Sequence, residues 1–204
     1  MADRLKAVLE TVRSRLVQPG ATRIGLALAV GIILLDQLSK WWVLNTLRLS
    51  PEGCLDFQLA GEMERAVMPN TCRHIEISGV FDLTMVWNKG VSFGFLGADT
   101  LIGRVLLVAF SLVVAGFLAA GLFGYGPLKT ERKLQALAFG MIIGGAIGNV
   151  VDRILFGAVV DFLNFSGLMF PWVFNIADVA INVGVGLIIL DMLLDMKPKA
   201  PTNS

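Results

Sequence analysis

The sequence predicts an all-α membrane bundle of four transmembrane helices, with a small β-sheet on one side and an amphipathic helix at the N-terminus. Of its 204 residues, 55% are hydrophobic and only 16% are charged, with a mean hydropathy of +0.73. A soluble domain of this size carries more charge on its surface. Several apolar runs have the length of about 20 residues that a helix needs to cross a bilayer. One connecting segment alternates apolar and polar residues, which is the period of a half-buried strand.

The N-terminal segment, residues 1–20, has the pattern of a helix that lies on a membrane surface. Apolar residues recur at helical spacing among basic ones, at Leu5, Val8, Leu9, Val12 and Leu16. Pro19 and Gly20 then interrupt the helix. We expect an anchoring helix over 1–20 and one transmembrane domain over 21–204.

Four apolar runs form the predicted spans, at residues 24–43, 101–123, 134–156 and 172–194. The first is not a cleavable signal peptide, because Asp36, Gln37 and Lys40 interrupt it without an A-x-A-like site. Lys and Arg cluster before the first span, between the second and third, and after the last. Since cytoplasmic loops collect these residues, both termini are predicted to be cytoplasmic in a bacterial inner membrane.

The long outer segment, residues 45–99, contains the predicted strand. Apolar side chains alternate with others along it, at Phe81, Leu83, Met85 and Trp87. We expect a small sheet or hairpin on the outer membrane face, with Trp41, Trp42 and Trp87 near the interface. His74, the one histidine, has no nucleophile or ligand set beside it in sequence, and we expect an ordinary surface residue.

Charged residues within the spans are costly in a bilayer and therefore face other helices. In the first span, Asp36 and Lys40 are four residues apart, acid first, which favours an ion pair. Pairing for stability is the leading interpretation, and contact with a substrate is the alternative.

The third span combines a packing stripe with a polar end. Gly140, Gly144 and Gly148 recur every four residues, so that a neighbouring helix can approach closely. Asn149, Asp152 and Arg153 follow as a polar cluster at the outer end. An internal Asp152–Arg153 pair and direct contact with a substrate both remain open.

Two aspartates flank the short outer loop between the third and fourth spans. Asp161 follows the third span, and Asp178 lies just inside the fourth, where Asn175 and Asn182 share its helical spacing. Two carboxyl groups in a poorly hydrated site share one proton, so that one is a general base and the other a general acid. Serine-nucleophile and zinc motifs do not occur in the sequence. From spacing alone, peptide hydrolysis and proton or ion transport both remain open.

Five ordered motifs resemble those of lipoprotein signal peptidase, or signal peptidase II. They are DQLSK at 36–40, NKGVSFG at 88–94, GGAIGNVVDR at 144–153, GAVVDF at 157–162 and FNIADVAINVG at 174–184. The resemblance implies four transmembrane helices, an outer sheet that cradles the substrate, and two catalytic aspartates without metal or cofactor. The substrate implied is a lipid-modified prolipoprotein, cleaved immediately before its diacylglyceryl-cysteine. Inhibition by globomycin-type cyclic peptides, contact with membrane lipids, a monomeric state and no nucleic-acid partner are expected.

By motif, the catalytic residues implied are Asp161 and Asp178. The other residues implied at the site line it or support its charges: Asp36, Lys40, Asn88, Gly90, Asn149, Asp152, Arg153 and Asn175. An inactive relative that binds precursors without cutting them is the alternative, and the intact aspartates argue against it.

Two features depart from the family pattern. Val91–Ser92 stands where the family has an alanine pair, and residues 53–74 form an insert that contains both cysteines. Cys54 and Cys72 are expected either as two free thiols or as a disulfide. A bridge would contribute roughly 3 kcal/mol of stability by the loop-entropy model.

Overall fold

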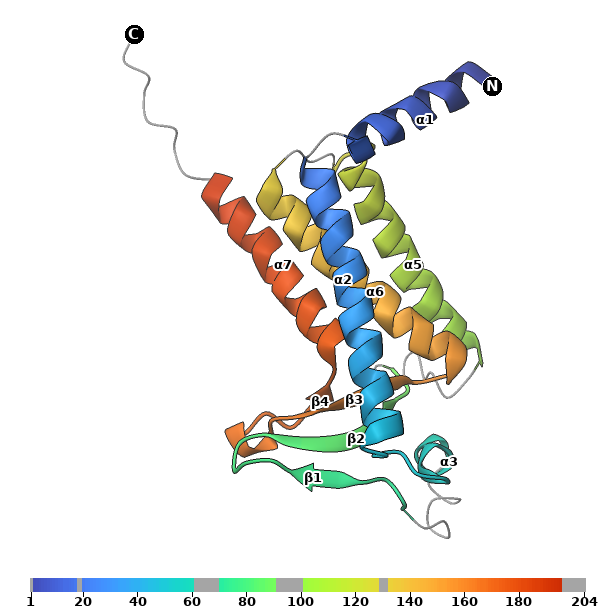
Figure 1. Cartoon of the computed structure of the whole chain (residues 1–204), viewed down its shortest axis with the longest axis vertical. Coiled ribbons are helices and arrows are strands. Elements are labelled where there is room, and N and C mark those ends of the chain that lie inside the picture. Colours follow the sequence, from blue (N-terminus) through green and yellow to red (C-terminus); the bar gives the residue numbers. More distant parts are fainter. Residues whose placement is uncertain (1, 18–19, 61–69, 91–100, 129–131, 196–204) are drawn as a thin grey trace.

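The computed structural model describes residues 2–17, 20–60, 70–90, 101–128 and 132–195. Within these ranges, four helices are long and apolar enough to cross a membrane. They are α2 (Ala21–Trp41, continued by the π-helix η1, Trp42–Thr46), α5 (Leu101–Leu122), α6 (Lys133–Leu155) and α7 (Ile176–Asp195). The N-terminal helix α1 (Ala2–Val17) lies at the same end of the bundle as the C-terminal end of α7 (Figure 1). The predicted fold class is thus confirmed.

Helix α6 is the central helix of the bundle, because most of its residues are buried whereas fewer than a third of those in the other three spans are. Its glycines permit this position. A Cβ at Gly140 would meet the carbonyl oxygen of Gly25 on α2, and one at Gly144 would lie 2.8 Å from that of Ala29. On the neighbouring face, a Cβ at Gly145 would meet the carbonyl oxygen of Ala177 on α7. The predicted packing role of the glycine stripe is therefore confirmed.

A four-stranded antiparallel sheet lies at the end of the bundle opposite α1 (Figure 1). Its strands, in spatial order, are β1 (His74–Glu76), β2 (Asp82–Asn88), β3 (Val159–Asn164) and β4 (Val173–Phe174). Strand β2 confirms the alternating pattern, since Leu83, Met85 and Trp87 are buried. His74 is exposed on β1.

Trp87 packs in the core beneath the sheet, only 6% exposed, whereas Trp41 and Trp42 are exposed. One detail of the sequence prediction is wrong. The fourth helix does not begin near 172: residues 173–174 pair with β3, and α7 begins at Ile176. An apolar run at the end of a helix has no periodicity that would separate it from a short buried strand.

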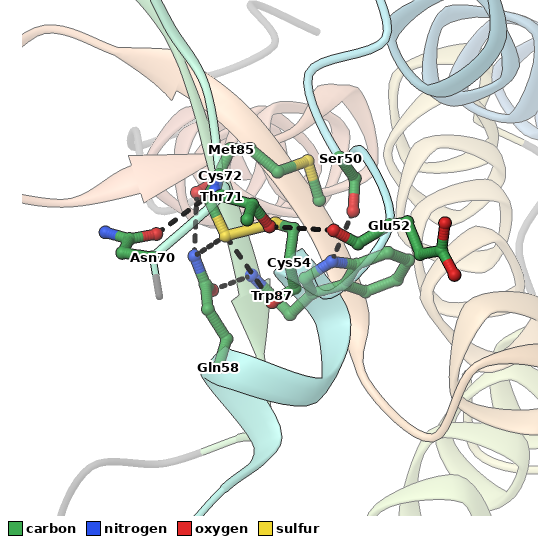
Figure 2. Close-up of a disulfide and its surroundings, with 9 residues drawn as sticks. All are labelled: Ser50, Glu52, Cys54, Gln58, Asn70, Thr71, Cys72, Met85 and Trp87. Carbon is green, nitrogen blue, oxygen red and sulfur yellow. Dashed lines mark hydrogen bonds between the residues drawn. A yellow bond between two sulfur atoms is a disulfide. The ribbon is translucent and has the colours of Figure 1, made fainter. Parts of the chain in front are cut away.

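The segment between the first and second spans adds a short helix, α3 (Cys54–Leu59), and a disulfide between Cys54 and Cys72 (Figure 2). The Cα atoms of the two cysteines are 4.7 Å apart, within the usual range for a bridge. Residues Val91 and Ser92 lie outside the described residues.

We predict that Gly140→Val destabilises the protein by roughly 2 kcal/mol more than Gly31→Val, through overpacking against α2. Gly31 is the matched control, because a Cβ there would meet nothing within 4 Å. Both variants carry the same cost in helix propensity, so thermal unfolding in detergent isolates the packing effect. Equal melting temperatures would contradict the close approach of α2 and α6.

Candidate active site

A buried polar cluster lies where α2, α6 and α7 meet the sheet. Most of its side chains are almost entirely inaccessible to solvent: Asp36, Lys40, Asn149, Asp152, Asp161 and Asn175. Arg153, Asp178 and Asn88 are partly buried beside them. Residues predicted from five separate motifs are therefore brought to one place.

The ammonium group of Lys40 is the centre of this cluster. Its Nζ lies 2.7 Å from Asp36 Oδ2, 2.8 Å from Asp152 Oδ2 and 3.2 Å from Asn149 Oδ1. A lysine ammonium has three N–H donors, so each finds one acceptor. The predicted Asp36–Lys40 pair is confirmed. The internal Asp152–Arg153 pair is not found between these described residues, because the Asp152 carboxylate is directed to Lys40.

Both carboxylates that bind Lys40 also hold the backbone beside a candidate catalytic aspartate. Asp36 Oδ1 accepts the N–H of Ala177 at 2.9 Å, directly before Asp178. Asp152 Oδ2 accepts the N–H of Val160 at 3.0 Å, directly before Asp161. The Ala177 N–H is one of the donors that a helix N-terminus leaves unpaired, so Asp36 also stabilises the start of α7.

Asp178 is fixed by a capping box at the start of α7. The Asn175 Oδ1 accepts the N–H of Asp178 at 2.9 Å, and Asp178 Oδ2 accepts the N–H of Asn175 at 3.4 Å. This reciprocal pattern satisfies two donors at the helix end and restricts the aspartate side chain. Asn175 therefore precedes the helix, and its alignment with Asp178 comes from capping rather than from helical stacking.

Amide side chains connect the two aspartates. Asn175 Nδ2 donates to Asp161 Oδ1 at 2.6 Å and to Asn149 Oδ1 at 3.1 Å, while Asn149 Nδ2 donates to Asp178 Oδ1 at 2.8 Å. From β2, Asn88 Nδ2 donates to Asp161 Oδ2 at 2.8 Å. The amide of Asn88 is itself oriented, because its Oδ1 accepts the N–H of Gly90 at 2.8 Å.

The electrostatic environment favours a proton on Asp161. Burial, and then the negative charge of Asp178, raise the pKa of Asp161 to about 7, although hydrogen bonds from Asn88 and Asn175 and the charge of Lys40 oppose the shift. The Asp161 carboxyl is 1% exposed, so desolvation acts strongly against its ionised form. A carboxyl with a pKa near neutrality can donate or accept a proton during a reaction.

Arg153 is a partly buried basic residue of the cluster. Among the described residues its Nε is buried without a hydrogen-bond partner, and its Nη1 donates to the carbonyl of Asn149 over a long distance, 3.4 Å. Its charge interacts with Asp178, Asp161 and Asp152. Since buried donors are nearly always paired, this one has capacity for a bound ligand.

Two polar residues were missed by the sequence analysis. Gln37 Nε2 donates to the carbonyl of Gly148 at 3.1 Å and to Asp152 Oδ1 at 3.0 Å, so it connects α2 to α6. Its position beside Asp36 in the DQLSK motif was the sequence signal for a role at the site. Asp191 is buried near the far end of α7, where Arg132 and Gln135 contact it, and belongs to helix packing rather than to this site.

Comparisons with known proteins identify the family and the fold that this chain resembles. A family model described as Signal peptidase (SPase) II matches residues 28–194. The lipoprotein signal peptidase of Caulobacter vibrioides is 42% identical over 177 residues, covering 86% of this chain and 90% of the relative. That of Azoarcus sp. is 40% identical over 175 residues, covering 85% of each. A solved bacterial membrane enzyme has the same fold, with a TM-score of 0.66 at 22% identity over 88% of this chain and 93% of its own.

We predict that Lys40→Met destabilises the protein by roughly 3 kcal/mol, because it leaves two buried carboxylates without their cation. Lys133→Met is the matched control, since Lys133 is exposed at the opposite end of α6. Denaturation in detergent measures both. A Lys40→Met variant as stable as the control would show that the ammonium group does not neutralise Asp36 and Asp152.

Proposed function

Since the chain belongs to the signal peptidase II family, we propose that it removes signal peptides from lipid-modified prolipoproteins and that Asp161 and Asp178 perform the hydrolysis. The observation that carries the assignment of these residues is their shared hydrogen-bond network. The side chain of Asn175 joins the two, because its Nδ2 donates to the Asp161 carboxyl and its Oδ1 accepts the backbone N–H of Asp178. The two carboxyl groups are also close enough for the charge of Asp178 to raise the pKa of Asp161.

In this mechanism, the two carboxyls hold a water molecule against the scissile carbonyl carbon. Asp178, the less buried of the two, accepts a proton from the water as its oxygen attacks. Asp161 carries the shared proton and donates it to the carbonyl oxygen. In the second step the amide nitrogen takes the proton from Asp178 and the C–N bond breaks, while a hydroxyl group of the tetrahedral intermediate returns its proton to Asp161 as the new carboxyl group forms. The amine leaves, and the pair is back in its starting protonation state.

The surrounding side chains favour this chemistry by fixing both carboxyls before the substrate arrives. The oxygen of each amide is held by a donor: Lys40 Nζ for Asn149, the Asp178 N–H for Asn175 and the Gly90 N–H for Asn88. Little reorganisation therefore accompanies the reaction. Arg153, whose Nε has no hydrogen-bond partner in the part of the chain that the structure describes, is placed to bind a carbonyl group of the substrate.

The position of the site fits a substrate that stays anchored in lipid. Acyl chains gain nothing by leaving the bilayer for water, so an enzyme for lipidated precursors has to work at the membrane surface. The cluster lies at the sheet end of the spans, and the sheet covers that end (Figure 1). We assign this end to the outer face of the inner membrane, with both termini cytoplasmic, on the distribution of Lys and Arg.

We assign the cleavage position to the bond immediately before the diacylglyceryl-cysteine, and we expect globomycin-type cyclic peptides to compete for the same site. Both assignments rest on the family resemblance of the five motifs. Mass spectrometry of the released peptide identifies the bond.

We predict that Asp161→Asn and Asp178→Asn each lower kcat by at least about a thousandfold, because each removes one general acid–base group. The measurement is gel-shift cleavage of a lipidated precursor by the purified protein in detergent. Each variant retains the shape of the side chain, so folding is checked by its melting temperature.

Glu76→Gln on β1 is the matched control, since it is the same acid-to-amide change at an exposed position of the sheet. It is expected to cleave at the wild-type rate. Full cleavage by either aspartate variant would remove that residue from the mechanism. Proton-driven solute uptake by the wild type, without cleavage, would favour transport instead.

We predict that kcat falls as the pH rises above about 7, because the pKa of Asp161 is raised to about 7 and its proton is needed for the reaction. The protonated fraction is nearly complete below this pH and decreases about tenfold per unit well above it. A pH–rate profile with a precursor at saturation tests this. A rate that stays level to pH 9 would contradict Asp161 as the proton donor.

A further inference from the structure

The outer edge of β2 is completed by a side chain rather than by a strand. Strand β1 pairs with β2 from Asp82 to Thr84, and the carbonyl of Arg73 accepts the N–H of Met85. Beyond Met85, the side chain of Gln58 on α3 bonds to the β2 backbone in place of a strand. Its Nε2 donates to the carbonyl of Met85 at 3.0 Å, and its Oε1 accepts the N–H of Trp87 at 2.6 Å (Figure 2). One carboxamide therefore makes the pair of bonds that a neighbouring strand would make.

Helix α3 is held in place by contacts with residues 70–73, which follow it in the chain. Its six residues are too few for a stable isolated helix. The Cys54–Cys72 disulfide joins its first residue to the chain that leads into β1, and Thr71 Oγ1 donates to the carbonyl of Glu52 at 3.0 Å (Figure 2). Gln58 Nε2 also lies 3.1 Å from Cys72 Sγ. We call α3 and residues 70–73, joined by the disulfide, the α3 clamp.

Trp87, whose backbone N–H is bound by Gln58, directly precedes Asn88, a hydrogen-bond donor to Asp161. Trp87 is fixed by Gln58 at its backbone, by Ser50 Oγ at its indole N–H (3.0 Å) and by an edge-on contact with Phe156. Asn88 comes next, pairs with Val159 of β3 and donates to Asp161. Displacement of the β2 edge at Trp87 would therefore move the amide that orients this carboxyl.

We infer that the α3 clamp is an oxidation-dependent positioning device, in which Gln58 holds the edge of β2 and thereby keeps Asn88 on Asp161. This inference rests on the proposed function, in which Asp161 is catalytic, and it assigns a role to the cysteine-containing insert. Reduction by a dithiol transfers two electrons and two protons to the bridge. It yields two protein thiols and the disulfide of the reagent, and it frees α3 from residues 70–73.

The pH profile distinguishes positioning from simple stability. The hydrogen bond from Asn88 favours the ionised form of Asp161, so its loss raises the pKa of Asp161 further. The other charged groups that act on Asp161 are Asp178 of α7, Lys40 of α2 and Arg153 of α6. The hydrogen-bond and ion-pair partners described above for these three residues lie outside α3 and residues 70–73. A shift caused by the clamp therefore passes through Asn88.

The experiment compares full-length wild type, oxidised or treated with dithiothreitol, with Gln58→Ala, Gln58→Glu and the Cys54→Ser/Cys72→Ser double variant. Each is assayed for kcat, KM and pH profile with a lipidated precursor. Gln58→Ala and reduced wild type are expected to lose about tenfold in kcat through mispositioning, and the basic limb of the profile should move upward. Their KM should stay within about twofold of the wild type.

Three comparisons sharpen the result. Gln58→Glu keeps the acceptor for Trp87 but loses the donor to Met85, so its kcat should lie between wild type and Gln58→Ala. The double serine variant should match reduced wild type and show no response to the reductant. Asn45→Ala, which removes an exposed amide outside the clamp that donates to the carbonyl of Trp41 at 3.0 Å, should retain wild-type kcat and pH profile.

Hydrogen exchange gives a readout that does not depend on cleavage. The Trp87 amide should exchange faster in Gln58→Ala and after reduction, because it loses its acceptor. Wild-type kcat and pH profile in both Gln58→Ala and reduced protein would overturn the inference, as would unchanged exchange at β2. If the wild type cleaved no precursor, the proposed function would fail, and the exchange rates alone would decide whether the clamp exists.

Discussion

A buried ammonium group organises the polar cluster of this membrane protein. Lys40 is bound by two carboxylates, and each of these also accepts the backbone N–H that precedes one of the aspartates Asp161 and Asp178. The same ammonium orients the amide of Asn149, whose other end donates to Asp178. In a medium without water, each polar group needs a protein partner, so the positions of these groups constrain one another. The positions of the two aspartates, on β3 and α7, therefore depend on the charge of Lys40 on α2.

The network also explains why the spans pack as they do. Glycines of α6 let α2 and α7 approach closely enough for short side chains such as Asp36 to reach across, and a Cβ at Gly148 would lie 2.6 Å from its Oδ2. Close packing therefore serves two purposes. It provides the dispersion contacts that hold the helices together, and it keeps the ionic groups out of lipid. The sheet completes the candidate site by contributing Asn88 and Asp161.

Much of this arrangement could be predicted from the sequence, for identifiable reasons. Length and hydropathy indicated the spans, period-two alternation indicated β2, and the four-residue spacing indicated the Asp36–Lys40 pair. The strands β3 and β4 were missed because short apolar runs beside a helix do not differ from the helix in pattern. The partner of Asp152 was not predictable either: adjacent residues on a helix do not face each other, and its real partner lies on another span. Gln58 carries no sequence signal, because an amide on a short outer helix is usually solvated.

The central claim is that two carboxyl groups are close enough to share one proton, and infrared titration tests it most directly. The absorption of protonated carboxyl groups would be followed between pH 4 and 9 in wild type and in Asp178→Asn. The account predicts a band in the wild type that disappears near pH 7, as expected from the raised pKa of Asp161. In Asp178→Asn the midpoint should fall, because the neighbouring negative charge is gone. The same midpoint in both proteins would show that the two groups are not coupled and would contradict the account.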